Sequence, residues 1–197
     1  MSAAMPVDDP GFVKRIQVGE PQALETVIKT YLGQILRAAG GAGLSPQEAE
    51  EVTQATFTTF VEKADRFEGR SRVRTWLFGI LYRKIAEARR QLSRSRQMDQ
   101  IGDVEERFND KGGWMRPPQA LDMQLYGKEI RRLIEDCLEA VPTRQRMAFY
   151  LREVEDLPTQ EICNILEVTR TNLGVLLFRV RNRLRECLEA KGVRRQQ

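Results

Sequence analysis

Histidine is absent from this chain of 197 residues, and its absence removes two large classes of functional site. Without imidazole there is no histidine general base or proton shuttle, and no zinc site that requires a histidine ligand. Three acids, Glu153, Glu155 and Asp156, precede a predicted turn, where they are more simply surface charges than metal ligands. The sequence therefore predicts a protein that is not an enzyme, with no catalytic residue, no metal site and no cofactor.

Cysteine is scarce as well, since the chain contains only Cys137, Cys163 and Cys187. Their wide spacing excludes a CxxC redox pair, and three cysteines do not make a four-cysteine metal site. We therefore expect each cysteine to act as a small buried apolar side chain in a reducing cytoplasm.

Long apolar runs are missing too, because no segment approaches the roughly 20 apolar residues that a membrane-spanning helix needs. The chain begins MSAAMPVDDPGF, which lacks the basic and then apolar order of a signal peptide. Aromatic residues make up 7% of the chain, apolar residues 41% and charged residues 30%, which is typical of a globular protein. We expect a cytoplasmic protein without membrane insertion.

Charge is unevenly distributed, although the net charge is only +4. Residues 70–96 contain nine Lys and Arg side chains against Glu87 alone, and residues 170–197 contain eight against two acids. The residues between these blocks are acidic overall. Two separated basic blocks suit a polyanion that is bound at two places, although solvated basic helix faces give the same pattern.

Apolar residues recur at helical spacing in the first half of the chain, and no segment there or later alternates like a strand. The predicted helices cover residues 22–39, 45–64 and 73–97. Ser45 and Pro46 give the second of these a start signal, and the glycine cluster at 40–43 ends the first. This cluster lacks the lysine of a phosphate-binding loop, so we interpret it as a turn. After residue 97 the periodicity fails, and glycine, proline and acids predict a flexible acidic linker.

Further helices are predicted in the second half, and the last two are joined by a turn at residues 167–169. This spacing is that of a helix-turn-helix, although a helical hairpin inside a core shares it. In the DNA-binding motif the second helix enters the major groove by its first turns. The side chains that would contact bases are Arg170, Thr171, Asn172 and Val175, and those that would contact phosphates are Arg179 and Arg181. We call these six residues the recognition set.

The predicted fold is all-α, with two small helical domains at residues 1–97 and 126–197, the second containing the helix-turn-helix, joined by the flexible acidic linker at 98–125. In this order the parts resemble a bacterial extracytoplasmic-function (ECF) sigma factor over nearly the whole chain. The residues that carry the resemblance are Val52-Thr53-Gln54 with Phe57, then Phe67 and Arg74-Thr75-Trp76-Leu77, and finally Arg179, Arg181 and Leu184.

The resemblance implies a transcription initiation factor that binds core RNA polymerase and assists melting at the −10 promoter element. The exposed face of helix 45–64 would dock on the polymerase through Glu51, Gln54, Thr58 and Glu62, which we call the polymerase set. The following loop and basic helix would capture a base flipped from the −10 non-template strand. These residues, the −10 set, are Glu68, Gly69, Arg70, Ser71, Arg72, Arg74, Trp76, Arg83 and Lys84. The apolar spacing of Trp76 also favours core packing.

The recognition set would then read the −35 duplex. The resemblance further implies an anti-sigma partner, in some cases one with its own zinc. This chain departs from the family at the turn, where Glu167 replaces the usual glycine, and in the recognition helix, where Gly174, Val175 and Leu176 stand at positions often filled by Lys, Ser and Arg. The −35 sequence therefore cannot be transferred from relatives.

One alternative remains open from the sequence. A helix-turn-helix regulator would bind closed duplex DNA without polymerase, with the first domain acting in dimerisation or sensing. The two hypotheses differ in whether the chain requires core polymerase to act.

Overall fold

The structure, a computed structural model, describes residues 7–95 and 127–192. These residues form helices and no strand, so the all-α prediction is confirmed. The elements are α1 (Pro10–Gln17), α2 (Pro21–Gly41), α3 (Pro46–Glu62), the short 3-10 helix η1 (Ala64–Arg66), α4 (Val73–Ser95), α5 (Gly127–Glu139), α6 (Thr143–Glu153), α7 (Thr159–Leu166) and α8 (Arg170–Ala190). The predicted acidic linker at 98–125 lies outside the described residues.

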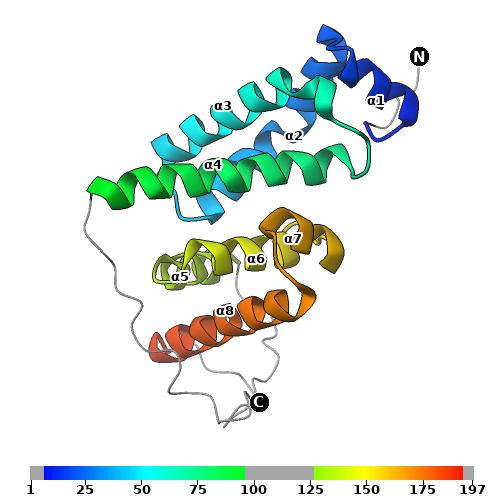
Figure 1. The fold of residues 1–197 in the computed structure, drawn as a ribbon. Helices are drawn as coiled ribbons and strands as arrows, with labels where there is room; N and C mark the ends of the chain where they lie inside the picture. Colours follow the sequence, from blue (N-terminus) through cyan, green and yellow to red (C-terminus); the bar gives the residue numbers. More distant parts are fainter. Residues whose placement is uncertain (1–6, 96–126, 193–197) are drawn as a thin grey trace.

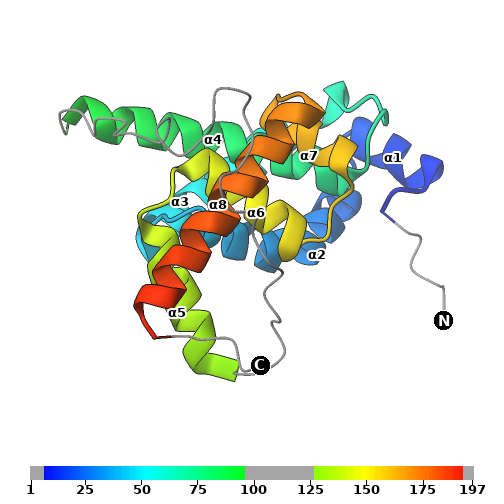
Figure 2. The same cartoon turned by 90° about the horizontal axis from the view of Figure 1, so that it is seen from below.

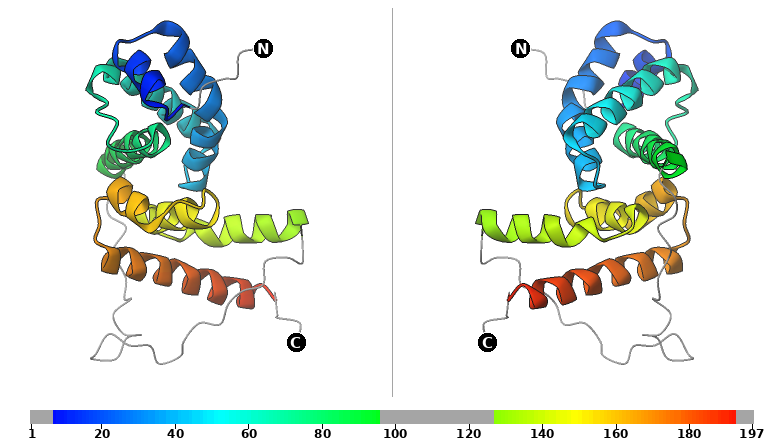
Figure 3. Two further views of the ribbon diagram at one scale, coloured as in Figure 1. Left: turned by 90° about the vertical axis from the view of Figure 1, so that its right-hand side faces the viewer. Right: turned by 90° about the vertical axis from the view of Figure 1, so that its left-hand side faces the viewer.

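The helices form two lobes that lie against each other (Figure 1). The first lobe contains α1 to α4 and the second contains α5 to α8. The side views show α6 and α7 between the first lobe and α8 (Figure 3). Seen from below, the C-terminal part of α4 extends beyond the second lobe (Figure 2).

The start of α3 follows the signal in its sequence. The Ser45 side chain accepts a hydrogen bond from the Glu48 amide at 3.3 Å, and the Glu48 carboxylate accepts one from the Ser45 amide at 2.7 Å. This reciprocal capping box, with Pro46 in the first turn, satisfies donors that a helix N-terminus leaves free. The predicted start of this helix is confirmed.

Helix α1 was not predicted from the sequence. Asp9 caps it by accepting a hydrogen bond from the Gly11 amide at 2.8 Å, and Pro10 occupies its first turn. Phe12 and Ile16 bury its inner face. An eight-residue helix offers a single i,i+4 apolar pair, which is too short a pattern to be recognised by periodicity.

One apolar core extends through both lobes. The largest fully buried side chains of the first lobe are Ile16, Ile35, Phe60, Leu77, Phe78, Leu81 and Ile85, and those of the second are Met147, Leu151, Leu157, Ile162 and Leu166. A smaller core joins α5 to the C-terminal half of α8 through Cys137, Leu138, Val141, Val180, Leu184 and Leu188. The relative position of the lobes is therefore set by apolar burial as well as by polar contacts.

The glycine cluster interpreted as a turn also lies where the lobes meet. A Cβ atom on Gly41 would lie 2.5 Å from Cδ2 of Tyr150, and one on Gly43 would lie 2.0 Å from Nη1 of Arg146. Gly43 also has a φ of +86°, which favours glycine. The absence of side chains here allows the end of α2 to approach α6 closely.

A disulfide joins α5 to α8 through Cys137 and Cys187, whose Cα atoms are 5.8 Å apart. The expectation that all three cysteines are unpaired is therefore wrong for these two, whereas Cys163 is free and buried as expected. The spacing of cysteines along the sequence identifies only local motifs such as CxxC. It carries no information on two cysteines 50 residues apart that the packing of α5 on α8 brings together.

Reduction of this disulfide is expected to lower the free energy of unfolding by about 2–4 kcal/mol, because the bond closes a long loop in the unfolded chain. Urea unfolding with and without reductant, followed by circular dichroism, measures the difference. The variant with Cys137→Ala and Cys187→Ala should be insensitive to reductant. Equal stability of the oxidised and reduced wild-type chain would contradict the prediction.

A second prediction concerns the close approach of α2 and α6. Gly41→Ala should lower the free energy of unfolding by about 1–3 kcal/mol, because the new methyl group overlaps the Tyr150 ring. Gly40→Ala is the matched control, since a Cβ there has no neighbour within 4 Å. This control should be neutral or more stable by up to about 1 kcal/mol. Urea unfolding measures both, and equal losses in the two variants would count against the contact.

Candidate polymerase and nucleic-acid interfaces

The polymerase set lies on the exposed side of α3, since Glu51, Gln54, Thr58 and Glu62 are all exposed. The expected orientation of the helix is therefore confirmed.

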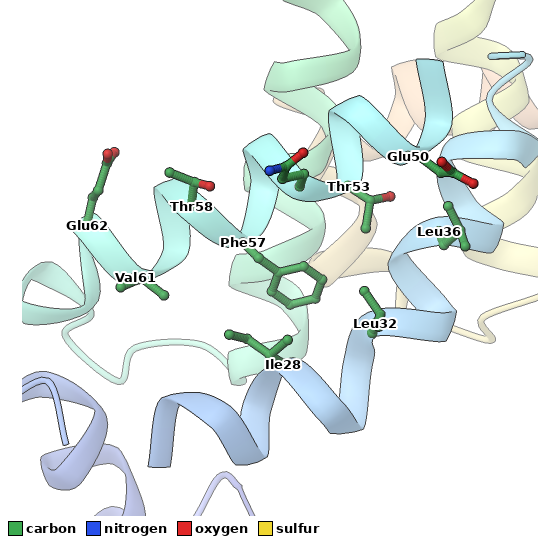
Figure 4. Close-up of a pocket in the computed structure, with 10 residues that line it drawn as sticks. Ile28, Leu32, Leu36, Glu50, Thr53, Phe57, Thr58, Val61 and Glu62 are labelled. Atoms are coloured by element: carbon green, nitrogen blue, oxygen red, sulfur yellow. The ribbon is translucent and has the colours of Figure 1, made fainter. Parts of the chain in front are cut away.

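An apolar groove lies beside this face, between α2 and α3, with a volume of about 590 Å³ (Figure 4). Phe57 of α3 lines it, opposite Ile28, Leu32 and Leu36 of α2. Gln54, Thr58 and Glu62 of the polymerase set also line the groove. These three side chains of the polymerase set thus lie along the edge of the apolar groove.

Three of the apolar side chains at this surface are well exposed: Leu32 at 46%, Leu36 at 37% and Val61 at 44%. An apolar stripe at helical spacing is expected to be buried, so the exposure of these three side chains differs from what the periodicity predicts. Periodicity identifies the apolar side of a helix but not how much of that side the neighbouring helices cover. Exposed apolar side chains around a groove are typical of a surface that binds an amphipathic helix.

The loop of the −10 set connects η1 to α4. Its first residue, Phe67, is buried and stacks on Trp76 with ring centroids 4.8 Å apart, and Trp76 also meets Phe60 edge-on at 5.6 Å. Trp76 is half-buried, so the structure agrees with core packing for this side chain. Through these two ring contacts, Trp76 packs against Phe67 and Phe60 and fixes the start of the loop.

The five residues that follow Phe67 in the loop are all exposed: Glu68, Gly69, Arg70, Ser71 and Arg72. Gly69 has a φ of +70°, a conformation that side chains rarely adopt. Glu68 and Arg70 form a solvent-exposed ion pair at 2.7 Å, which has a small energetic value and breaks easily. This short segment presents backbone and charged groups to solvent without a covering element.

The basic residues of α4 have a different environment, because two of them contact the second lobe. Nη2 of Arg74 lies 2.5 Å from the buried Glu155 carboxylate and donates to the Glu155 carbonyl oxygen at 2.7 Å. Nη2 of Arg83 lies 3.3 Å from the Glu167 carboxylate. Arg74 is therefore not open to DNA in this arrangement, whereas Arg83 stays largely exposed although it is paired, and the sequence predicted neither contact.

Two further residues of α4, Thr75 and Lys84, also form polar contacts. Thr75 donates a hydrogen bond to the Glu161 carboxylate of α7. Lys84 remains in the first lobe and pairs with Glu87, one turn further along α4, at 3.0 Å. Three carboxylates of the second lobe, Glu155, Glu161 and Glu167, thus face α4.

Several side chains near the junction of the lobes have shifted pKa values. Burial raises the pKa of Tyr150 to about 12, with a further contribution from the Glu155 carboxylate. Burial also raises the pKa of Tyr82 on α4. The pKa of Arg146 is lowered by burial and then by the charge of Arg89. Both tyrosines are neutral at pH 7, as a tyrosine with its ordinary pKa is, and the shifts keep them neutral to higher pH.

The helix-turn-helix predicted from the sequence is present as α7 and α8. Glu167 ends α7 in the left-handed region, with φ of 54° and ψ of 52°, so the backbone of a glycine turn is retained without the glycine. Thr169 caps α8 by accepting from the Asn172 amide at 3.2 Å. Arg144 of α6 donates to the Leu166 carbonyl oxygen at 2.9 Å and holds the end of α7.

Most of the recognition set is exposed on α8: Arg170, Thr171, Asn172, Val175 and Arg181, with Arg179 half-buried. Leu173, Leu176 and Leu177 bury the opposite side of the same turns. Arg181 pairs with Glu153 at 2.5 Å, and Arg170 donates to Gln160 at 3.2 Å. The first turns of α8 can therefore enter a groove of DNA while the helix stays packed in its lobe.

Within residues 7–95 and 127–192, no helix is long and apolar enough to cross a membrane. The same residues contain no group of three or more Cys, Asp or Glu side chains positioned to hold a metal ion.

Comparison with protein families assigns one family to each lobe. The model of sigma-70 region 2 matches residues 27–95, and the model of sigma-70 region 4 matches residues 131–184. The first match covers the groove, the −10 loop and α4, and the second includes the helix-turn-helix.

Curated proteins with similar sequences are sigma factors. A "Probable RNA polymerase sigma factor" of Haemophilus influenzae is 30% identical over 151 residues, which cover 73% of this chain and 78% of the relative. The ECF RNA polymerase sigma-E factor of Escherichia coli K12 is 24% identical over 178 residues, which cover 88% of this chain and 90% of that protein.

Two solved structures have a similar fold. CnrH in complex with the cytosolic domain of CnrY matches with a TM-score of 0.64 at 17% identity, covering 93% of this chain and 98% of that chain. The sigma factor RpoE in complex with the anti-sigma factor NepR, from Bartonella quintana, matches with a TM-score of 0.64 at 21% identity, covering 87% and 98%.

Proposed function

Because this chain belongs to the sigma-70 family of RNA polymerase sigma factors, in its ECF group, we propose that it directs core RNA polymerase to specific promoters and assists melting at −10. We assign polymerase and −10 binding to residues 1–97 and −35 binding to residues 126–197, with a linker at 98–125. The observation that carries the proposal is the match of region 2 to one lobe and of region 4 to the other. The chain would act as a specificity subunit in the cytoplasm and not as an enzyme.

The proposed polymerase contact is the groove between α2 and α3 together with the polymerase set. Leu32 and Val61 supply exposed apolar surface, and Glu62 supplies charge at the edge. An amphipathic helix of core polymerase fits this chemistry, with apolar side chains in the groove and polar or basic ones at its edge. Apolar burial then supplies affinity, and the polar edge supplies orientation.

The proposed −10 contact is the exposed loop at residues 68–72. A base flipped out of the non-template strand can be read there by backbone groups and by Arg70 or Arg72, which a closed duplex would not permit. The basic residues of α4 would hold the phosphates of the opened strand.

The proposed −35 contact is the exposed side of α8. Thr171 and Asn172 can donate and accept hydrogen bonds at base edges, and the exposed Val175 side chain suits a thymine methyl group. Arg179 and Arg181 would contact phosphates, which fixes orientation without reading sequence.

We further propose that an anti-sigma protein controls this chain, as suggested by the similar sigma factor RpoE, which was solved in complex with the anti-sigma factor NepR. The apolar groove is a surface that such a partner could share with polymerase. Any zinc in such a complex would be held by the partner, since this chain has no histidine to supply an imidazole ligand.

The first test mixes the purified chain with sigma-free core polymerase and measures co-elution, followed by transcription from a library of −35 and −10 sequences. Stoichiometric co-elution with selective initiation is the expected result. Tight binding to duplex DNA without association with core would favour the helix-turn-helix regulator instead.

The same assay tests the groove. Leu32→Glu should weaken binding to core polymerase by at least about tenfold, since a carboxylate would have to be buried in an apolar contact. Val18→Glu is the matched control, because Val18 is an exposed apolar residue outside the groove, at 79% exposure. Full affinity of Leu32→Glu for core would show that the polymerase binds elsewhere.

The proposed function requires the contacts between α4 and the second lobe to open, since Arg74 cannot bind a phosphate while it pairs with Glu155. Glu155→Gln should therefore raise the affinity of the free chain for a −10 non-template oligonucleotide by about three- to tenfold. Asp136→Asn makes the same charge change in the second lobe, at a residue paired with Lys191. Fluorescence anisotropy at low salt measures both, and equal increases would indicate only the general effect of net charge.

A further inference from the structure

Helix α1 lies outside both matched family segments, at 27–95 and 131–184, yet it contacts the −10 loop. The loop has no regular secondary structure of its own between η1 and α4. Three contacts from residues 8–17 meet it at its start, its middle and its end.

The start of the loop is held by Gln17, the last residue of α1. Its Nε2 atom donates a hydrogen bond of 2.6 Å to the carbonyl oxygen of Phe67. The Phe67 side chain is buried against Trp76, so both its backbone and its ring are fixed. The backbone position from which the exposed residues 68–72 start is therefore fixed.

The end of the loop is held by Asp8, which precedes α1. Its Oδ1 atom accepts a hydrogen bond of 2.9 Å from the amide of Val73, the first residue of α4. This contact acts as an N-cap supplied from 65 residues away. Arg72, which precedes Val73, has no side-chain acceptor and cannot provide it.

The middle of the loop passes over the same helix. A Cβ atom on Gly69 would lie 3.5 Å from a methyl group of Val13. Phe12 and Ile16 anchor α1 in the core, and Arg15 pairs with Glu20 at its C-terminal end. The loop therefore rests on a helix that is itself fixed.

We propose that α1 is a positioning element for −10 recognition, with Asp8 and Gln17 as positioning residues that set the backbone geometry of residues 68–72. The proposal rests on the proposed function of this loop in reading a flipped base. Discrimination between bases requires groups held to within about 0.5 Å, and a loop that ordered only on binding would lose affinity to the entropy of ordering. Contacts at both ends of so short a segment supply that order before DNA binds.

The test uses the full chain assembled with core polymerase and the promoter selected from the library described above. Initiation is measured on that promoter and on versions with each other base at the −10 position that the loop reads. For Asp8→Ala and Gln17→Leu, the preference for the selected base should fall by at least about fivefold. Affinity for core polymerase and dependence on the −35 sequence should stay unchanged.

Two further variants separate positioning from stability. Asp9→Ala removes the neighbouring carboxylate and the local cap of α1, which makes no hydrogen bond to the loop, and should keep the base preference. Asp8→Asn retains an acceptor oxygen for the Val73 amide and should restore most of the preference lost in Asp8→Ala. In the same chains, hydrogen exchange at residues 68–72 should be faster for Asp8→Ala and Gln17→Leu than for Asp9→Ala.

The proposal is overturned if Asp8→Ala and Gln17→Leu reduce initiation equally on all −10 sequences. It is also overturned if base preference survives in every variant. Failure of the proposed function gives a different result, because the unmodified chain would then not associate with core polymerase or would initiate without selectivity.

Discussion

The packing of α4 against α7 is the contact on which the rest of the structure depends. Helix α4 buries Val73, Leu77, Phe78, Leu81 and Ile85, an arc too wide for one neighbouring helix to cover. It therefore packs on α2 and α3 in its own lobe and on α7 in the other. The helix that carries the basic residues proposed for −10 binding is thus also the helix that joins the lobes.

The polar contacts around this helix differ in strength. Arg74 and Glu155 are largely shielded from water, so breaking their pair leaves a charge poorly solvated. Arg83 and Glu167 are about two-thirds exposed, and such a pair contributes about 0–1 kcal/mol and weakens with salt. The buried pair is consequently the stronger polar contact between the lobes, and the exposed pair contributes little to holding them together.

Sequence patterns predicted what is local in this fold. Ser45 and Pro46 marked the start of α3, and the turn before α8 appeared where its spacing required, because caps and periodicity act over a few residues. Contacts between distant segments were not predicted: the Cys137–Cys187 disulfide and the Arg74–Glu155 pair depend on the packing of helices far apart in the chain. The polymerase set faced solvent as its stripe indicated, whereas the exposure of Leu32 followed from a missing neighbour, which periodicity cannot reveal.

The start of α4 shows how function constrains local stability. Helices α3 and α8 begin with their own capping side chains, Ser45 and Thr169, whereas α4 begins after Arg72, whose side chain cannot accept a hydrogen bond. A capping residue at position 72 would stabilise the helix but would remove a positive charge from the loop that is proposed to meet DNA. Moving the acceptor to Asp8 retains both the charge and the cap. The Asp8 carboxylate also lies at the positive end of the α4 dipole, so the distant cap provides the hydrogen bond and the favourable charge together.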